Sequence, residues 1–112
     1  MFIFSTINLF LKNMSKKILV LGAGSWGTAI ANVLSKKNHK VYLWARDKNL
    51  SKYINTNKIN KKYYKNFKLS KNLKSIIGNF RANDYHYIFY ILPAHAFENF
   101  CSKYLKNQKI NN

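Results

Sequence analysis

Short hydrophobic runs alternate along this chain with segments whose apolar residues repeat at a helical spacing. Residues 17–21 form a continuous apolar run, which is typical of a parallel strand that is covered on both faces. Residues 25–37 are predicted to form a helix because apolar side chains fall on one face. That face consists of Ala29, Ile30, Val33 and Leu34. Asn38 tolerates the left-handed conformation that commonly ends a helix, and residues 40–44 form the second predicted strand.

The middle of the chain is rich in lysine and asparagine and has a weaker pattern. A short helix is expected at residues 49–57, and a short strand at either 67–69 or 73–76. Residues 76–83 are predicted to form another short helix. This region therefore contributes less regular structure than the segments on either side of it.

Aromatic and β-branched residues dominate residues 85–92, which predict a further strand that ends at Pro93. A helical pattern then covers residues 94–105. Strands that alternate with helices predict an α/β fold with a doubly wound parallel sheet, a partial Rossmann fold of about four strands. Right-handed crossovers give the strand order 3-2-1-4. Residues 85–92 then lie at an exposed apolar edge, which is an aggregation liability unless covered, so the chain resembles part of a domain.

A Gly-x-Gly-x-x-Gly motif joins the first strand to the first helix, at Gly22, Gly24 and Gly27. In a dinucleotide-binding turn the first glycine permits the tight turn, the second lets the backbone approach a pyrophosphate, and the third lets the helix pack closely on the sheet. Ser25 and Trp26 would present backbone N–H groups to the phosphates at the start of the helix. The alternatives are a helix cap for Ser25 and a packing role for Trp26.

The residues after the second strand bear on which dinucleotide is bound. An acidic side chain there binds the ribose 2′-hydroxyl of NAD, whereas an arginine accommodates the 2′-phosphate of NADP. Arg46 holds that position, and Asp47 follows as a candidate for the ribose. We therefore expect NADP(H) to be accepted and preferred, with NAD(H) as an alternative. A solvated surface arginine is the other interpretation.

The 112 residues carry a formal charge of +17, from 20 Lys+Arg against 3 Asp+Glu. The lysines are dispersed and accompany no recognition helix, zinc-ligand spacing or aromatic RNA-binding signature, so specific nucleic-acid binding is not expected. A single cysteine, Cys101, cannot form an intrachain disulfide and fits the reducing cytoplasm. No run reaches the roughly 18–20 apolar residues that a membrane span needs, and no metal-ligand spacing is present.

The first 13 residues are expected to be an extension outside the fold, with a membrane-anchoring helix as the alternative. Residues 14–112 are expected to form an incomplete NAD(P)-binding Rossmann domain.

Several segments together resemble the start of bacterial NAD(P)-dependent sn-glycerol-3-phosphate dehydrogenase. They are the run Gly-Ala-Gly-Ser-Trp-Gly-Thr-Ala at residues 22–29, the segments 38–41 and 43–47, the Asn-x-x-Tyr loop that includes Tyr63, and the fourth strand that ends at Pro93. The resemblance implies cofactor contacts for Ser25, Trp26 and Tyr63, with a surface aromatic as the alternative for Tyr63. Pro93 is expected to fix the backbone at the end of the fourth strand, beside the crevice over which the nicotinamide half of the cofactor would lie. The resemblance covers residue 14 to about residue 105, nearly everything after the N-terminal extension.

The reaction that the resemblance implies is hydride transfer from NAD(P)H to dihydroxyacetone phosphate, which gives sn-glycerol 3-phosphate for phospholipid synthesis. The family's catalytic lysines lie beyond the fourth strand, one of them in an all-helical substrate domain, so no residue of this chain is assigned a catalytic role. We expect a fragment that is inactive alone and is completed by a second, C-terminal chain. The alternatives are a stand-alone basic nucleotide- or nucleic-acid-binding module and a fragment of a related hydroxy-acid dehydrogenase.

Overall fold

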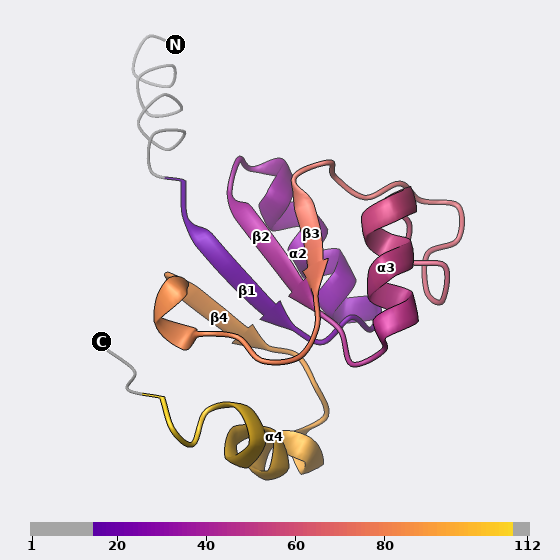
Figure 1. The fold of residues 1–112 in the computed structure, drawn as a ribbon. Coiled ribbons are helices and arrows are strands. Elements are labelled where there is room, and N and C mark those ends of the chain that lie inside the picture. Colours follow the sequence, from indigo (N-terminus) through magenta and orange to yellow (C-terminus); the bar gives the residue numbers. More distant parts are fainter. Residues whose placement is uncertain (1–14, 109–112) are drawn as a thin grey trace, which may run out of the picture.

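A four-stranded parallel sheet forms the centre of the molecule in the computed structural model, which describes residues 15–108. The strands are β1 (Lys17–Leu21), β2 (Lys40–Trp44), β3 (Leu73–Ile76) and β4 (Tyr87–Tyr90). They lie in the order β3-β2-β1-β4, which confirms the predicted order (Figure 1). The bounds predicted for the first two strands are also correct. The predicted extension over residues 1–13 lies outside the described residues.

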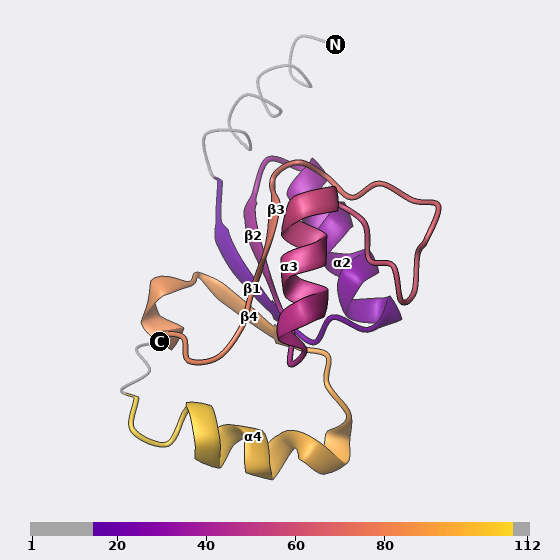
Figure 2. The same ribbon diagram turned by 45° about the vertical axis from the view of Figure 1, so that its right-hand side comes forward.

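Helices cover both faces of this sheet. The helices α2 (Ser25–Lys36) and α3 (Lys48–Asn57) lie on one face, and α4 (Phe97–Tyr104) lies on the other (Figure 2). Two single-turn 3-10 helices, Ala82–Asp84 and Ala94–Ala96, flank β4. Within residues 15–108 no helix combines the length and the apolar character that crossing a membrane requires.

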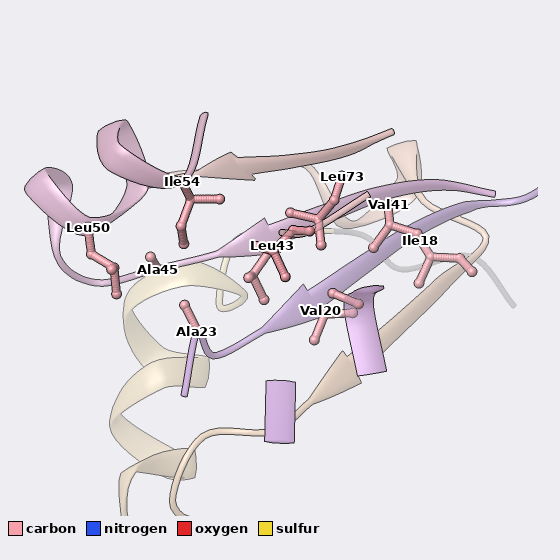
Figure 3. Close-up of a cluster of buried hydrophobic side chains, with 11 residues drawn as sticks. Ile18, Val20, Ala23, Val41, Leu43, Ala45, Leu50, Ile54 and Leu73 are labelled. Atoms are coloured by element: carbon pink, nitrogen blue, oxygen red, sulfur yellow. The ribbon is translucent and has the colours of Figure 1, made fainter. Parts of the chain in front are cut away.

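Alternate side chains of β1 belong to two separate hydrophobic clusters, as expected for a strand covered on both faces. Ile18 and Val20 join the larger cluster, which lies between the sheet and the α2 and α3 helices (Figure 3). Leu19 and Leu21 join the second cluster, on the α4 side, together with Phe100. All four of these β1 side chains are buried.

The face that α2 buries differs from the predicted one. Small and polar residues face the sheet instead of the apolar set: Gly27, Thr28, Ala31, Asn32 and Ser35. Ile30 and Leu34 pack only at the margin of the larger cluster, and Val33 is 54% exposed. Short side chains bring the helix axis close to the strands, and this close approach decides which face is buried.

The region after β3 also departs from expectation. The helix predicted at residues 76–83 is wrong, because Gly78 adopts a left-handed φ of 71° and only the Ala82–Asp84 turn forms. Of the two alternatives for the third strand, residues 73–76 are correct. The buried Leu69 instead contributes its side chain to the core from an irregular loop.

The fourth strand lies at the edge of the sheet and pairs with β1 on one side. Its side chains Tyr87, Ile88 and Phe89 are 54%, 37% and 39% exposed. The strand is shorter than predicted, and residues 94–105 form a 3-10 turn followed by α4 instead of one helix. The long apolar edge that the sequence predicts is therefore present in shortened form.

Candidate nucleotide-binding site

The turn between β1 and α2 is held by contacts that only glycine allows. Gly22 has a φ of +123°, and its N–H donates to the Trp44 carbonyl at 3.0 Å. A Cβ on Gly27 would lie 1.7 Å from the Gly22 carbonyl oxygen. The turn therefore closes directly onto the first turn of α2, and this contact brings the helix close to the sheet.

The start of α2 faces an open space. Gly24 is the N-cap residue, and the Thr28 N–H donates to its carbonyl at 3.0 Å. Ser25, Trp26 and Gly27 come before Thr28 in the chain, so their N–H groups have no acceptor within the helix. A Cβ on Gly24 would meet no atom within 4 Å. Free donors, a positive helix end and an uncrowded backbone are the features that bind a phosphate.

A cleft of about 640 Å³ lies over this turn, at the carboxyl end of β1 and β4. It brings together most of the residues that the sequence predicts for the site. They are Gly22, Gly24, Ser25, Trp26, Gly27, Tyr63 and Pro93, joined by Ile30, Ile91 and Leu92. Trp26 is 75% exposed and Tyr63 is 44% exposed, so both aromatic rings are accessible from solvent.

A buried asparagine, which the sequence interpretation did not assign, holds the Tyr63 loop against the glycine turn. The Asn60 Nδ2 donates to the Ala23 carbonyl at 3.0 Å and to the Thr28 Oγ1 at 2.8 Å. The Tyr64 hydroxyl adds a bond of 3.0 Å to the Ser25 carbonyl. These three acceptors lie in or beside the glycine motif, so the loop and the turn form one unit. The resemblance pointed to this loop, but not to the bonds that fix it.

The loop begins where α3 ends. Lys58 has a left-handed φ of 56°, and its Nζ donates to the Leu73 carbonyl at 2.6 Å. The pKa of Lys58 lies below its ordinary value, mainly because the side chain is partly buried and to a smaller extent because the positive charge of Lys74 repels it. This lysine therefore joins the start of the loop to β3 and does not line the cleft.

The two residues predicted after β2 lie outside the first cleft. Arg46 is exposed and lines a second cleft of about 500 Å³ on the α4 side. The Asp47 carboxylate instead caps α3, because its Oδ1 accepts from the Asn49 N–H at 2.8 Å and the Leu50 N–H at 3.2 Å. The structure therefore gives Asp47 a definite structural role at the start of α3.

The histidines show no catalytic arrangement in the part of the chain that the structure describes. The Nδ1 atoms of His39 and His86 accept the backbone N–H groups of Lys16 and Lys17, at the amino end of the sheet. Cys101 is partly buried on α4. Among the described residues no cluster of His, Cys, Asp and Glu could hold a metal ion.

Comparisons with known proteins point to one family. A family model described as NAD-dependent glycerol-3-phosphate dehydrogenase N-terminus matches residues 17–112. The glycerol-3-phosphate dehydrogenase [NAD(P)+] of Carboxydothermus hydrogenoformans is 36% identical over 100 residues, which cover 86% of this chain and 30% of that protein. The corresponding protein of Limosilactobacillus reuteri is 48% identical over 60 residues, covering 54% of this chain and 18% of the relative.

Solved structures agree. The glycerol-3-phosphate dehydrogenase of Plasmodium falciparum superposes with a TM-score of 0.73 at 27% identity, over 91% of this chain and 31% of that one. The enzyme of Coxiella burnetii gives a TM-score of 0.66 at 26% identity, over 86% and 31% of the two chains. The chain thus spans about a third or less of the proteins that it matches. It belongs to the family of NAD-dependent glycerol-3-phosphate dehydrogenase N-termini.

Proposed function

We propose that this chain is the cofactor-binding part of an NAD(P)-dependent glycerol-3-phosphate dehydrogenase. The observation that carries the proposal is the start of α2, where N–H groups without helical acceptors face an open cleft beside Gly24. A pyrophosphate fits this position because it would accept these N–H groups and is favoured by the helix dipole. Among the described residues, the alternative of a nucleic-acid-binding module has no comparable structural feature in its favour. A fragment of a different hydroxy-acid dehydrogenase would share this turn, and the match to the glycerol-3-phosphate dehydrogenase family favours the proposal over it.

Each residue of the cleft has a separate role in this proposal. Gly22 and Gly27 shape the turn, and Gly24 keeps its surface clear for the pyrophosphate. Ser25 and Trp26 donate backbone N–H groups to the phosphates, while Tyr63 and Pro93 line the rim, as their places in the cleft suggest.

The bound nicotinamide cofactor would supply the hydride that reduces dihydroxyacetone phosphate to sn-glycerol 3-phosphate. This chain positions the cofactor by its phosphates, and the catalytic groups would come from the remainder of the enzyme. A soluble phosphorylated substrate and a single cysteine fit a cytoplasmic location.

We further propose that a complementing C-terminal polypeptide completes the domain along β4. The exposed side chains Tyr87, Ile88 and Phe89 support this idea, because an apolar strand edge is stabilised when another strand pairs with it. Residues 14–112 would then be the first part of a larger Rossmann domain, and residues 1–13 an extension of it.

The direct test is a titration of the full chain with NADPH and NADH, followed by tryptophan fluorescence. The exposed Trp26 in the cleft should report binding. A Trp26→Phe variant identifies which ring gives the signal, and calorimetry measures binding without a fluorophore. Absence of binding to both nucleotides by calorimetry would contradict the proposal, as would tight, salt-sensitive DNA binding in their place.

The activity is tested separately, as oxidation of NADPH that depends on dihydroxyacetone phosphate. We expect no turnover with this chain alone and turnover when the complementing polypeptide is added. Turnover by the chain alone would show that the catalytic groups lie within it.

A further inference from the structure

The second cleft lies beside the glycine turn, on the α4 side of the sheet. Its walls come from the end of β2, the turn after β3 and one face of α4. The lining residues are Trp44, Arg46, Ile77, Gly78, Asn99, Phe100, Lys103 and Tyr104. The bond from the Gly22 N–H to the Trp44 carbonyl, 3.0 Å long, joins the end of β2 to the turn. Both clefts therefore lie at the carboxyl edge of neighbouring strands, where a doubly wound sheet binds its ligand.

Packed aromatic rings fix the inner wall of this cleft. Trp44 is buried, and its Nε1 donates to the Gly78 carbonyl at 2.8 Å. The rings of Phe100 and Tyr104 each lie 5.3 Å from the Trp44 ring in edge-to-face contact. These contacts attach α4 to the sheet, so the side chains that α4 presents to the cleft start from a fixed backbone.

The charged groups of the cleft are both cationic. Arg46 comes from the end of β2 and Lys103 from α4, and both side chains are exposed. The lining residues include no carboxylate. The nearest acidic residue in sequence to Arg46 is Asp47, and its Oδ1 accepts two N–H groups at the start of α3. The positive charge of the cleft is therefore available to an external anion.

We propose that Lys103 is a second cation for the ribose 2′-phosphate of NADP(H) and acts with Arg46 as a specificity-determining residue. This inference rests on the proposed function, because it requires the dinucleotide to lie across the two clefts. Arg46 offers a planar fork of donors to the phosphate, and Lys103 adds a flexible point charge from the opposite wall. The Lys103 Nζ lies 5.3 Å from the centroid of the Tyr104 ring, at the wall of the cleft. A cofactor without the 2′-phosphate would leave both cations without an anionic partner, so Lys103 should affect only the phosphorylated cofactor.

The test uses the full chain and a pair of ligands, 2′,5′-ADP and 5′-AMP, which differ only in the 2′-phosphate and lack the nicotinamide half. Calorimetry should show that the wild-type chain prefers 2′,5′-ADP. In Lys103→Met we expect the Kd for 2′,5′-ADP to rise about tenfold, and that for 5′-AMP to change less than about twofold. Lys103→Arg should retain most of the preference because it keeps the positive charge.

Lys106→Met is the matched control, since Lys106 is an exposed lysine just beyond α4 that does not line the cleft. It should bind both ligands as the wild-type chain does. Unchanged affinity of Lys103→Met for 2′,5′-ADP, or equal weakening of both ligands, would overturn the inference and leave the proposed function standing. Failure of the wild-type chain to bind 5′-AMP, 2′,5′-ADP, NADH and NADPH would overturn both.

Discussion

Asn60 and Thr28 lie 32 positions apart in sequence, yet the Asn60 Nδ2 donates to the Thr28 Oγ1 at 2.8 Å in the buried space beneath the glycine turn. The same amide nitrogen also donates to the Ala23 carbonyl, and the Asn60 Oδ1 accepts the Lys62 N–H at 3.2 Å. Asn60 has no exposed surface. One side chain therefore satisfies polar groups of the glycine turn, of α2 and of its own loop.

Asn60→Ala should destabilise the chain substantially, because it leaves buried donors and acceptors without partners. We expect the free energy of unfolding to fall by about 2–4 kcal/mol, measured by urea denaturation. Asn57→Ala is the control: Asn57 is exposed, and its Nδ2 donates only to the Tyr53 carbonyl, at 3.3 Å. Its effect should stay within about 0.5 kcal/mol. Similar effects of the two substitutions would contradict the role given to Asn60.

The end of α2 allows a prediction about backbone conformation. Asn38 is exposed and has a left-handed φ of 67°. Asn38→Ala should lower the free energy of unfolding by about 1 kcal/mol, because a Cβ disfavours this conformation. Asn38→Gly should match or slightly exceed the wild-type stability. The comparison of thermal or urea midpoints checks this order, and a more stable alanine variant would refute it.

The sequence was sufficient for the parts of the fold that local patterns determine. Continuous apolar runs placed β1 and β2, and the order of strands followed from the handedness of crossovers. The glycine motif also predicted that Gly27 lets the helix pack closely, and a Cβ there would lie 1.7 Å from the Gly22 carbonyl oxygen. These features depend on residues that are near one another in sequence.

Long-range polar contacts explain what the sequence did not reveal. The Ser70 N–H donates to the buried Asn32 Oδ1 at 2.8 Å, so an asparagine on α2 faces the loop before β3 instead of solvent. Apolar periodicity alone cannot identify such a face, and it selected Val33 instead. The cap that Asp47 forms on α3 was missed for a similar reason. The helix was predicted to begin at Asn49, one residue late, so Asp47 did not fall at the N-cap position.

Arg46 should control the choice of nucleotide if it binds the 2′-phosphate. Arg46→Ala is expected to weaken NADPH binding about tenfold or more while NADH binding changes less than about twofold. Lys48→Ala removes a neighbouring exposed cation that does not line the second cleft, and should affect both nucleotides equally little. Equal weakening of NADPH and NADH by Arg46→Ala would show that the arginine does not recognise the 2′-phosphate.

Alanine substitutions at two glycines of the motif should have separate effects, one on the stability of the fold and the other on cofactor binding. A Cβ on Gly27 would collide with the Gly22 carbonyl at 1.7 Å, whereas a Cβ on Gly24 would enter open space. Gly27→Ala should therefore reduce the free energy of unfolding by about 3 kcal/mol or more. Gly24→Ala should change it by less than about 1 kcal/mol, because its φ of −78° suits any residue.

At Gly24 we expect an alanine to weaken cofactor binding more than it destabilises the fold. The added methyl group would occupy the surface that the pyrophosphate needs, so NADPH affinity should fall at least about tenfold in a chain that still unfolds cooperatively. Urea denaturation and calorimetry on the same samples measure both quantities. A Gly24→Ala chain that is folded and binds NADPH normally would show that the phosphates do not lie against Gly24.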